Sequence, residues 1–373
     1  MRRCLDLPLD GHPKDRKFCY LDVALRLGQK PPCSGHGMHK ALVTGATGFV
    51  GSNLVVALRR LGWSVRTLVR DPTRAAHLAE LDAEIVTGSL QVLDKLSEAV
   101  AGVDTVFHVA GRVSALNRQQ FFEDNVVGTR TVMEACAKEP NSPIVVMVSS
   151  LAAGGPSQPG SPRQETDPDN PVSAYGESKL AAENEACKLA NRVPLTIIRP
   201  PVVFGPGDHN SFKLFQGICM TRLHAVPGLR SMPMSIVHVA DLSTALVQLA
   251  ENGARVQPGT DHSAGVYYIS SGRTISYGDF GRLAAAGLGK RVFVLPLPKA
   301  MFWIVGGAME GIGQIRRKPG IFNWDKVREA VASGWECSDE KLRRDVGYKP
   351  AAPLEQRFAD TATWYREQGW LKT

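Results

Sequence analysis

The chain reads Lys40-Ala-Leu-Val-Thr-Gly-Ala-Thr-Gly-Phe-Val-Gly51 in its first sixth. An apolar strand runs here into glycines spaced three residues apart, and a helical pattern follows them. Gly45 permits a tight turn, Gly48 lets the backbone approach a pyrophosphate, and Gly51 lets helix and strand pack closely. Free N–H groups at the helix start would bind the phosphates. The stretch therefore predicts a dinucleotide-binding turn.

Short apolar runs recur after this turn, separated by amphipathic segments. They span 64–69, 84–86, 105–110, 144–150 and 195–198. Continuous apolar character indicates strands buried on both faces, and the helices between them indicate a parallel sheet. We therefore expect an α/β fold with a doubly wound parallel sheet over residues 38–205. Residues 206–373 are richer in Pro and Gly and predict mainly a smaller C-terminal substrate-binding lobe, with 235–250 returning to the sheet domain.

The composition is that of a globular protein, with 43% hydrophobic and 21% charged residues in 373. The net charge is +8, and residues 1–40, with eight Lys or Arg and four Asp, carry half of it. The rest of the chain is mildly basic and has no basic run interleaved with aromatic residues. We therefore expect no nucleic-acid partner.

The first 37 residues differ from the body of the chain. They contain four Asp and no long apolar run, which matches neither a secretory signal nor a transit peptide. Met38 stands two residues before the first strand. We expect either a disordered extension over residues 1–37 or a true start at Met38.

The seven cysteines are widely spaced and include no Cys-x-x-Cys pair. This usage suits a reducing compartment, and we expect a cytoplasmic protein. Three cysteines lie near three histidines in the first 39 residues, but zinc modules need closer ligand pairs, so we expect no metal site. These residues are Cys4, Cys19, Cys33, His12, His36 and His39.

An apolar segment covers residues 300–309, and Glu310 ends it far short of the roughly 20 residues that span a bilayer. Three readings stay open: a buried or lid helix, the lining of an apolar substrate pocket, or peripheral membrane contact through 300–318, where Arg316, Arg317 and Lys318 follow.

The stretch Tyr175-Gly-Glu-Ser-Lys179 places a phenol and an ammonium four residues apart, on one face of a helix. A positive charge stabilises a phenolate, so the tyrosine becomes a usable proton donor and acceptor. The preceding strand ends in Ser149-Ser150, so both segments should meet the glycine turn at the carboxyl edge of the sheet.

These motifs make the chain resemble the extended short-chain dehydrogenase/reductase family from about Met38 to Lys372. The matching stretches are 44–51, 107–110, 125–129, 148–150, 175–179 and 199–206. The resemblance implies a Rossmann sheet with Tyr175 as general acid/base. It also implies that Lys179 holds the nicotinamide ribose and lowers the tyrosine pKa, and that Ser150, rather than Ser149, hydrogen-bonds the reacting oxygen. Asn125 resembles the family's supporting asparagine, although capping of the following helix is an alternative role.

The same resemblance implies where a dinucleotide would be contacted. The residues are Gly45, Thr47, Gly48, Phe49, Val50, Gly51, Arg70, Ser89, Leu90, Val109, Ala110, Gly111, Lys179, Pro200, Val202 and Val203. Gly88-Ser-Leu90 departs from the family's usual Gly-Asp-Leu, which weakens the expected adenine contact. Arg70 stands where NAD enzymes carry an acid, and its guanidinium would suit a 2′-phosphate, so we expect NADP(H). Asp71 leaves NAD(H) open.

Within the family, residues 65–72 look like dihydroflavonol reductases and the later apolar segment resembles 3β-hydroxysteroid dehydrogenase-like and hopanoid-associated proteins. The segment 200–204 lacks the asparagine that nucleotide-sugar enzymes often carry. We expect an NAD(P)-dependent oxidoreductase that interconverts a secondary alcohol and a ketone on a fairly apolar small molecule (sterol-, triterpenoid- or flavonoid-like). Alternatives are a redox-neutral nucleotide-sugar epimerase or dehydratase that retains NAD, and a catalytically idle NAD(P)-sensing protein. By analogy with the family, a homodimer is expected.

Overall fold

A computed structural model describes residues 39–228, 232–257, 259, 262–316 and 324–371. The predictions for residues 1–37, including the cysteines at 4, 19 and 33, lie outside the described residues.

Within the described residues, seven parallel strands form the central sheet in the order β11-β6-β5-β4-β1-β2-β3. The strands are β1 (Lys40–Thr44), β2 (Ser64–Val69), β3 (Glu84–Thr87), β4 (Thr105–His108), β5 (Ile144–Val148), β6 (Leu195–Arg199) and β11 (Val266–Tyr268). The strand order reverses between β1 and β4, and ligands of such sheets bind at this switch point, outside the carboxyl ends. The predicted doubly wound parallel sheet is confirmed.

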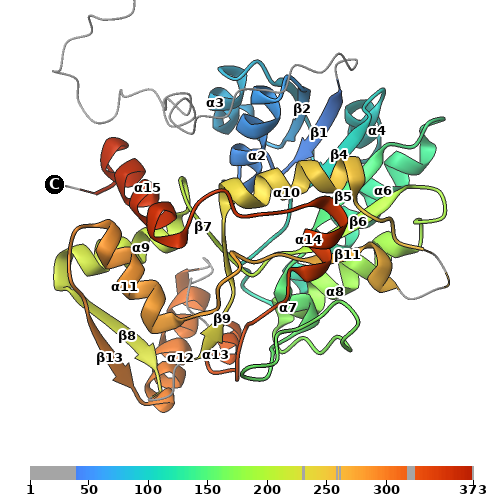
Figure 1. Ribbon diagram of the computed structural model, residues 1–373. Helices are drawn as coiled ribbons and strands as arrows, with labels where there is room; N and C mark the ends of the chain where they lie inside the picture. The colour runs from blue at the N-terminus through green and yellow to red at the C-terminus, as the bar shows by residue number, and fades with distance from the viewer. Residues whose placement is uncertain (1–38, 229–231, 258, 260–261, 317–323, 372–373) are drawn as a thin grey trace, which may run out of the picture.

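Helices cover both faces of the sheet (Figure 1). One layer contains α2 (Phe49–Arg60), α10 (Val239–Asn252) and α14 (Glu340–Val346), and the other contains α4 (Leu93–Val100), α6 (Gly128–Lys138) and α8 (Ala174–Cys187). Successive strand residues face opposite layers: Leu42 packs into the core under α4 and α6, whereas Val43 packs into the core under α2 and α10. Three late segments therefore lie with the sheet, namely α10, β11 and α14.

The lobe lies beside the sheet, at the lower left of Figure 1. Its strands form three two-stranded sheets: β7 (Val202–Phe204) with β10 (Ile236–His238), β8 (Leu223–Pro227) with β13 (Phe293–Leu297), and β9 (Pro233–Met234) with β12 (Ile275–Ser276). Its helices are α9 (His209–Thr221), α11 (Tyr277–Gly287), α12 (Lys299–Arg316), α13 (Trp324–Ala330) and α15 (Leu354–Glu367). Aromatic rings fill its core, and Phe204 stacks on Phe358 with ring centroids 4.3 Å apart. The remaining short elements are η1 (Pro72–Ala75), α3 (Ala76–Ala79), α5 (Arg118–Phe122), η2 (Glu123–Val127), α7 (Leu151–Gly154) and η3 (His262–Gly265).

A buried ion pair joins the lobe to the sheet domain. Arg357 of α15 donates two hydrogen bonds to the carboxylate of Asp241 on α10, and both side chains are 4% exposed. The backbone N–H of Ala351 donates to the same carboxylate at 3.0 Å. The two regions therefore share one fully desolvated charge pair.

The apolar segment predicted at residues 300–309 lies inside α12, which has 18 residues. Across the residues that the structure describes, we find no helix with the length and apolar character to cross a bilayer. Arg317 and Lys318 and the side chain of Arg316 lie outside the described residues.

Candidate active site

The glycine turn between β1 and α2 depends on two close backbone contacts. Gly45 has φ +73°, and a Cβ there would lie 2.7 Å from the backbone N of Ala110, just beyond β4. A Cβ at Gly51 would lie 2.2 Å from the carbonyl oxygen of Gly45. A larger residue at either position would displace the turn or the helix.

The start of α2 leaves its backbone donors available. Gly48 is the N-cap and supplies no capping side chain, and the first turn contains no acidic residue. The first N–H groups of a helix have no partner inside it, so Phe49, Val50 and Gly51 can donate to phosphate oxygens. Thr47 is half-buried in the same turn. The residues present therefore fit the diphosphate of a dinucleotide.

A buried polar chain lies beneath this turn. Nδ1 of His108, the last residue of β4, is 2.9 Å from the hydroxyl of Thr44, and Nε2 is 3.0 Å from the hydroxyl of Thr129. Thr129 in turn donates to the carbonyl oxygen of Asn125 at 2.6 Å. Burial, and secondly the charge of Lys179, lower the pKa of His108 to about 3, so the ring is neutral at physiological pH. These hydrogen bonds join β1, β4 and α6 and fix their relative positions.

The helix α8 carries Tyr175 and Lys179, and a close contact fixes its start. Ser173 caps it by accepting the N–H of Gly176 at 3.0 Å. A Cβ at Gly176 would lie 2.4 Å from the carbonyl oxygen of Ala152, so the helix lies directly against the segment that follows Ser150. The glycine of the Tyr175–Lys179 motif thus sets the distance between the tyrosine and the serine.

Lys179 is buried at the end of β5. Its ammonium donates to the carbonyl oxygen of Val148 at 2.8 Å, and a Cβ built on Gly111 would lie 3.3 Å from it. Burial lowers the pKa of Lys179 to about 8, although the carboxylate of Glu183 opposes that shift. The lysine therefore lies beside the loop where Val109, Ala110 and Gly111 were predicted to contact a cofactor.

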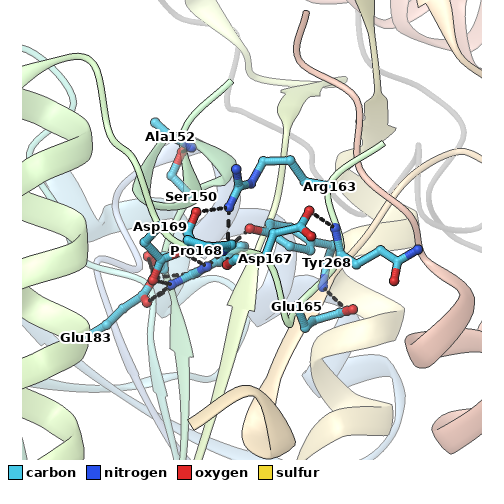
Figure 2. A network of polar contacts seen from close by, with 12 residues as sticks. Ser150, Ala152, Arg163, Glu165, Asp167, Pro168, Asp169, Glu183 and Tyr268 are labelled. Carbon is cyan, nitrogen blue, oxygen red and sulfur yellow. Dashed lines mark hydrogen bonds and ion pairs between the residues drawn. The ribbon is translucent and has the colours of Figure 1, made fainter. Parts of the chain in front are cut away.

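An ion-pair network anchors α8 to the last strands (Figure 2). The guanidinium of Arg199, at the end of β6, donates to the carboxylates of Glu183 and Asp169 and to the hydroxyl of Tyr268. Burial lowers the pKa of the Arg199 guanidinium, but Glu183, Asp169 and Tyr268 together outweigh burial and raise it. Ser149 donates to Glu183 and is therefore occupied in this network. Figure 2 shows Ser150 beside the network. The Ser150 hydroxyl is the one that acts on the phenol of Tyr175.

Tyr175 lies between the sheet domain and the lobe. Burial raises the pKa of its phenol; the charge of Lys326 and a hydrogen bond with Ser150 lower it, and the charge of Glu329 raises it. The Lys326 ammonium lies 5.1 Å from the centre of the tyrosine ring, and the ring of Phe121 in α5 packs at 6.0 Å on centroids. The cation that acts on the phenol in this structure belongs to α13, and the predicted effect of Lys179 on that pKa stays a prediction.

The contacts of α13 explain how Lys326 is held. Its ammonium pairs with Glu329 at 2.8 Å, and Glu329 accepts the hydroxyl proton of Ser173 at 2.7 Å. Glu329 thus joins α13 to the start of the helix that carries Tyr175.

Asn125 lies in the π-helical turn η2, and such turns are frequent at functional sites. Its side-chain oxygen accepts the N–H of Arg112 at 2.7 Å, and its amide donates to the hydroxyl of Ser178 at 2.9 Å. These contacts join the loop after β4 to α8. The capping alternative is wrong, because the N-cap of α6 is Val127.

The other predicted cofactor contacts lie at the ends of the strands. Arg70 follows β2 and is exposed, while the Ser89 hydroxyl accepts the N–H of Gln91 at 3.3 Å. Leu90 packs against Gly128 at the start of α6. After β6, Pro200 is buried, Val202 is exposed and Val203 is half-buried. We find no group of three metal-ligating side chains within the described ranges.

Sequence reasoning missed Lys326 and Glu329, which lie about 150 residues after Tyr175 and belong to no motif. It also missed Ser173 as a helix cap, although a serine just before a helical pattern was a usable signal. The roles of Glu183 and Arg199 had no such signal, because their pairing is visible only in three dimensions.

Comparisons with known proteins agree with this geometry. Residues 41–265 match the model of the NAD dependent epimerase/dehydratase family. The chain is 31% identical to ceramide reductase of Caulobacter vibrioides, over 88% of this chain and 95% of that one. It is 27% identical to a 3-beta-hydroxysteroid dehydrogenase of Mycolicibacterium neoaurum, over 88% and 92%. The crystal structure of gox2253 matches with a TM-score of 0.71 and 27% identity, over 89% of this chain and 99% of that one.

Both the family match and these relatives extend over the glycine turn, the strand ends and α8. The chain therefore belongs to the NAD dependent epimerase/dehydratase family, the extended short-chain dehydrogenases/reductases, and it is an NAD(P)-dependent enzyme.

Proposed function

We propose that this enzyme uses NADP(H) to interconvert a secondary alcohol and a ketone on a fairly apolar substrate, of sterol-like, flavonoid-like or long-chain lipid character. The observation that carries the proposal is the placement of Tyr175 next to Ser150, because Gly176 holds the start of α8 against the Ala152 carbonyl and the Ser150 hydroxyl lowers the pKa of the phenol. Lys179 lies one helical turn further along α8, beside the loop that borders the glycine turn.

Each of these side chains has a role in moving one proton. In the oxidative direction the Tyr175 oxygen would take the proton of the substrate hydroxyl, and in the reductive direction it would return that proton. The Ser150 hydroxyl would donate a hydrogen bond to the substrate oxygen as charge develops there. Lys179, held by the Val148 carbonyl, would bind the ribose and stabilise the phenolate. The nicotinamide, when bound, accepts or supplies the hydride.

Exposed apolar side chains near the strand ends support an apolar substrate. Val113, five residues beyond the end of β4, is 56% exposed, and Val202, after β6, is 45% exposed. Phe121 contributes a ring next to Tyr175. Relatives that are named as ceramide and hydroxysteroid enzymes support the same substrate character.

The end of β2 supports NADP(H) over NAD(H). Asp71 is engaged locally, because its carboxylate accepts the N–H and the hydroxyl of Thr73 at 3.0 and 2.6 Å. Arg70 makes no hydrogen bond or ion pair with any residue that the structure describes, so its guanidinium is available to a 2′-phosphate.

The first test is native mass spectrometry of the purified protein before and after addition of NADP⁺ or NAD⁺. We expect reversible uptake of NADP⁺, followed by NADPH oxidation with a panel of sterol, flavonoid and long-chain ketones. Tyr175→Phe should lower kcat/KM by about 10³-fold and leave NADPH binding unchanged. Tyr277→Phe, a tyrosine of α11 in the lobe, is the control and should retain activity.

Two results would contradict the proposal. Tightly bound NAD that does not exchange would identify a redox-neutral epimerase or dehydratase and direct the search to nucleotide sugars. Full dinucleotide binding with no turnover on any ketone or alcohol, and no effect of Tyr175→Phe, would identify a sensing protein.

A further inference from the structure

One end of the lobe exposes an unusual amount of apolar surface. Fourteen large apolar side chains are exposed among the described residues, and nine of them lie between residues 220 and 324. They belong to β8, β13, α12 and the segments next to them. β13 pairs with β8, and α12 begins two residues after the end of β13; Figure 1 shows these elements at the end of the lobe away from β1–β3. We call the outward faces of β8, β13 and α12 the lobe-end surface.

The two-stranded sheet contributes one complete apolar face. Phe293 pairs with Leu223 and Leu295 with Ala225, and alternate residues of a strand share a face. Phe293 is 66% exposed, Leu223 50% and Leu295 38%. The opposite face packs on α11, where His224 is buried and its Nε2 lies 2.9 Å from the carbonyl oxygen of Tyr277. The exposed face therefore has no partner within the described part of the chain.

The helix α12 contributes an apolar stripe. Its exposed residues recur at helical spacing: Met301, Ile304, Val305 and Met309. Ile304 is 72% exposed. The other side of the helix packs on α13, with Trp303 against Trp324 at 5.5 Å between ring centroids. The stripe points away from the lobe core.

Basic residues outnumber acidic ones around this surface, and the one acidic residue of α12 is Glu310, at the end of the apolar stripe. Residues 209–228 and 288–309 contain no Asp or Glu. They contain five basic residues: Lys213, Arg222, Lys290, Arg291 and Lys299. Arg222 directly precedes β8 and Arg291 lies two residues before β13, so both lie at the same end of the paired strands. The apolar face of the paired strands thus has basic residues at one end.

The exposed apolar side chains together with the basic residues indicate which kind of partner would cover this surface. A second copy of the chain would bring the same basic residues against these, which is unfavourable. An anionic lipid surface offers hydrocarbon to the apolar side chains and negative headgroups to the basic ones. We propose that the lobe-end surface docks the enzyme on anionic membranes. The proposal does not depend on the substrate or on the proposed reaction.

The test is flotation of the full-length protein with vesicles of phosphatidylcholine, with and without phosphatidylglycerol. We expect binding to the anionic vesicles that weakens with salt. Arg222→Asn with Arg291→Gln should reduce the partition coefficient by about fivefold per charge, because one basic residue near the surface is worth about that factor. Asparagine suits Arg222, whose φ is 56°.

The apolar arm of the test uses Phe293→Ser with Ile304→Ser, and we expect about a tenfold loss for each side chain. Both residues are exposed, so the unfolding temperature should not change. The control pair is Leu61→Ser with Val92→Ser, which are 43% and 47% exposed on the sheet domain. Binding through the first 38 residues would be common to all variants and would not respond to them.

Two outcomes would overturn the proposal. One is the absence of binding to anionic vesicles, or binding that the lobe variants do not weaken relative to the control pair. The other is a dimer in sedimentation velocity that Phe293→Ser with Ile304→Ser dissociates while no vesicle is bound, since a second copy would then cover the surface.

Discussion

The sheet domain and the lobe bury apolar residues in different ways. The strands of the sheet lie between two helical layers, and Ala41, Leu42 and Val43 of β1 are all fully buried. In the lobe, the sheet of β8 and β13 is covered on one face only, and Phe293 stays 66% exposed on the other. A sheet covered on both faces gives a fixed platform for cofactor binding. A sheet covered on one face leaves apolar surface for other molecules.

The two regions are nevertheless joined by several polar contacts within the described residues, and two of these contacts connect helices. The Arg357–Asp241 ion pair ties α15 to α10, and the Glu329–Ser173 hydrogen bond ties α13 to α8. Substitutions at these contacts and at the site measure how far the two regions depend on each other, and the largest effect is expected at Arg357.

Arg357→Met should remove about 3–5 kcal/mol from the free energy of unfolding, because it leaves the Asp241 carboxylate buried and uncompensated. The measurement is urea denaturation followed by both circular dichroism and tryptophan fluorescence. If the ion pair makes the regions cooperative, the two probes should give coincident transitions in the parent protein and separate ones in the variant.

The double change Arg357→Met with Asp241→Leu is the matched control. It removes both charges and should restore most of the lost stability. If the double variant is as unstable as Arg357→Met alone, lost packing and not the buried charge accounts for the loss of unfolding free energy.

Gly176→Ala in the sheet domain and Gly217→Ala in the lobe together compare how closely the two regions pack around a glycine. Its Cβ would lie 2.4 Å from the Ala152 carbonyl oxygen, so α8 must move and take Tyr175 away from Ser150. We expect kcat/KM to fall by about 10²-fold in assays of turnover. In the lobe helix α9, a Cβ at Gly217 meets no atom within 4 Å, so Gly217→Ala should keep activity and add up to about 1 kcal/mol of stability. Equal activities of the two variants would contradict the close-contact argument.

Arg70→Asp tests whether a residue of the sheet domain sets the preference for NADPH over NADH. Removing a charge-assisted hydrogen bond should weaken NADPH binding by about 10- to 100-fold relative to NADH, measured by fluorescence titration. Lys138→Asp makes the same charge change on α6 and should leave the NADPH to NADH ratio unaltered. Equal losses for both dinucleotides in Arg70→Asp would remove the 2′-phosphate assignment.

Lys326→Met tests whether the lobe acts on the chemistry. Loss of this cation should raise the pKa of Tyr175 further, because burial already raises it and Lys326 opposes that shift. Oxidation needs the phenolate, so the rise of the oxidation rate with pH should move to higher pH. Reduction needs the phenol, so its rate should persist to higher pH. Both profiles should move in the same direction.

A titration of ¹³C-labelled tyrosine by NMR, assigned with Tyr175→Phe, gives the same shift without any substrate. Lys326→Arg keeps the charge and should restore the parent profile. An unchanged titration of Tyr175 in Lys326→Met would show that α13 has no electrostatic effect on the site.

Much of the sheet domain was predictable, because its signals are local. The glycine turn, the continuous apolar strands and the Tyr175–Lys179 spacing each follow from neighbouring residues, and the fold and the family are confirmed. The lobe was predicted only in outline. Its strands are two to five residues long and pair across large separations, as when Leu223 pairs with Phe293, so no local periodicity marks their partners. For the same reason the approach of Lys326 to Tyr175 had no sequence signal. The assigned roles of individual site residues stay predictions.

The position of Lys326 has a consequence for how enzymes of this design can diverge. The groups proposed to transfer the proton lie at the start of α7 and on α8, where Gly176 and the Arg199 network leave little freedom to change. The charge that adjusts the acidity of the phenol comes instead from a seven-residue helix of the other region. If Tyr175 acts as proposed, substitutions in α13 would change the pH range of turnover while Tyr175 and Ser150 stay identical, so adaptation to a different compartment would not require changes in α8.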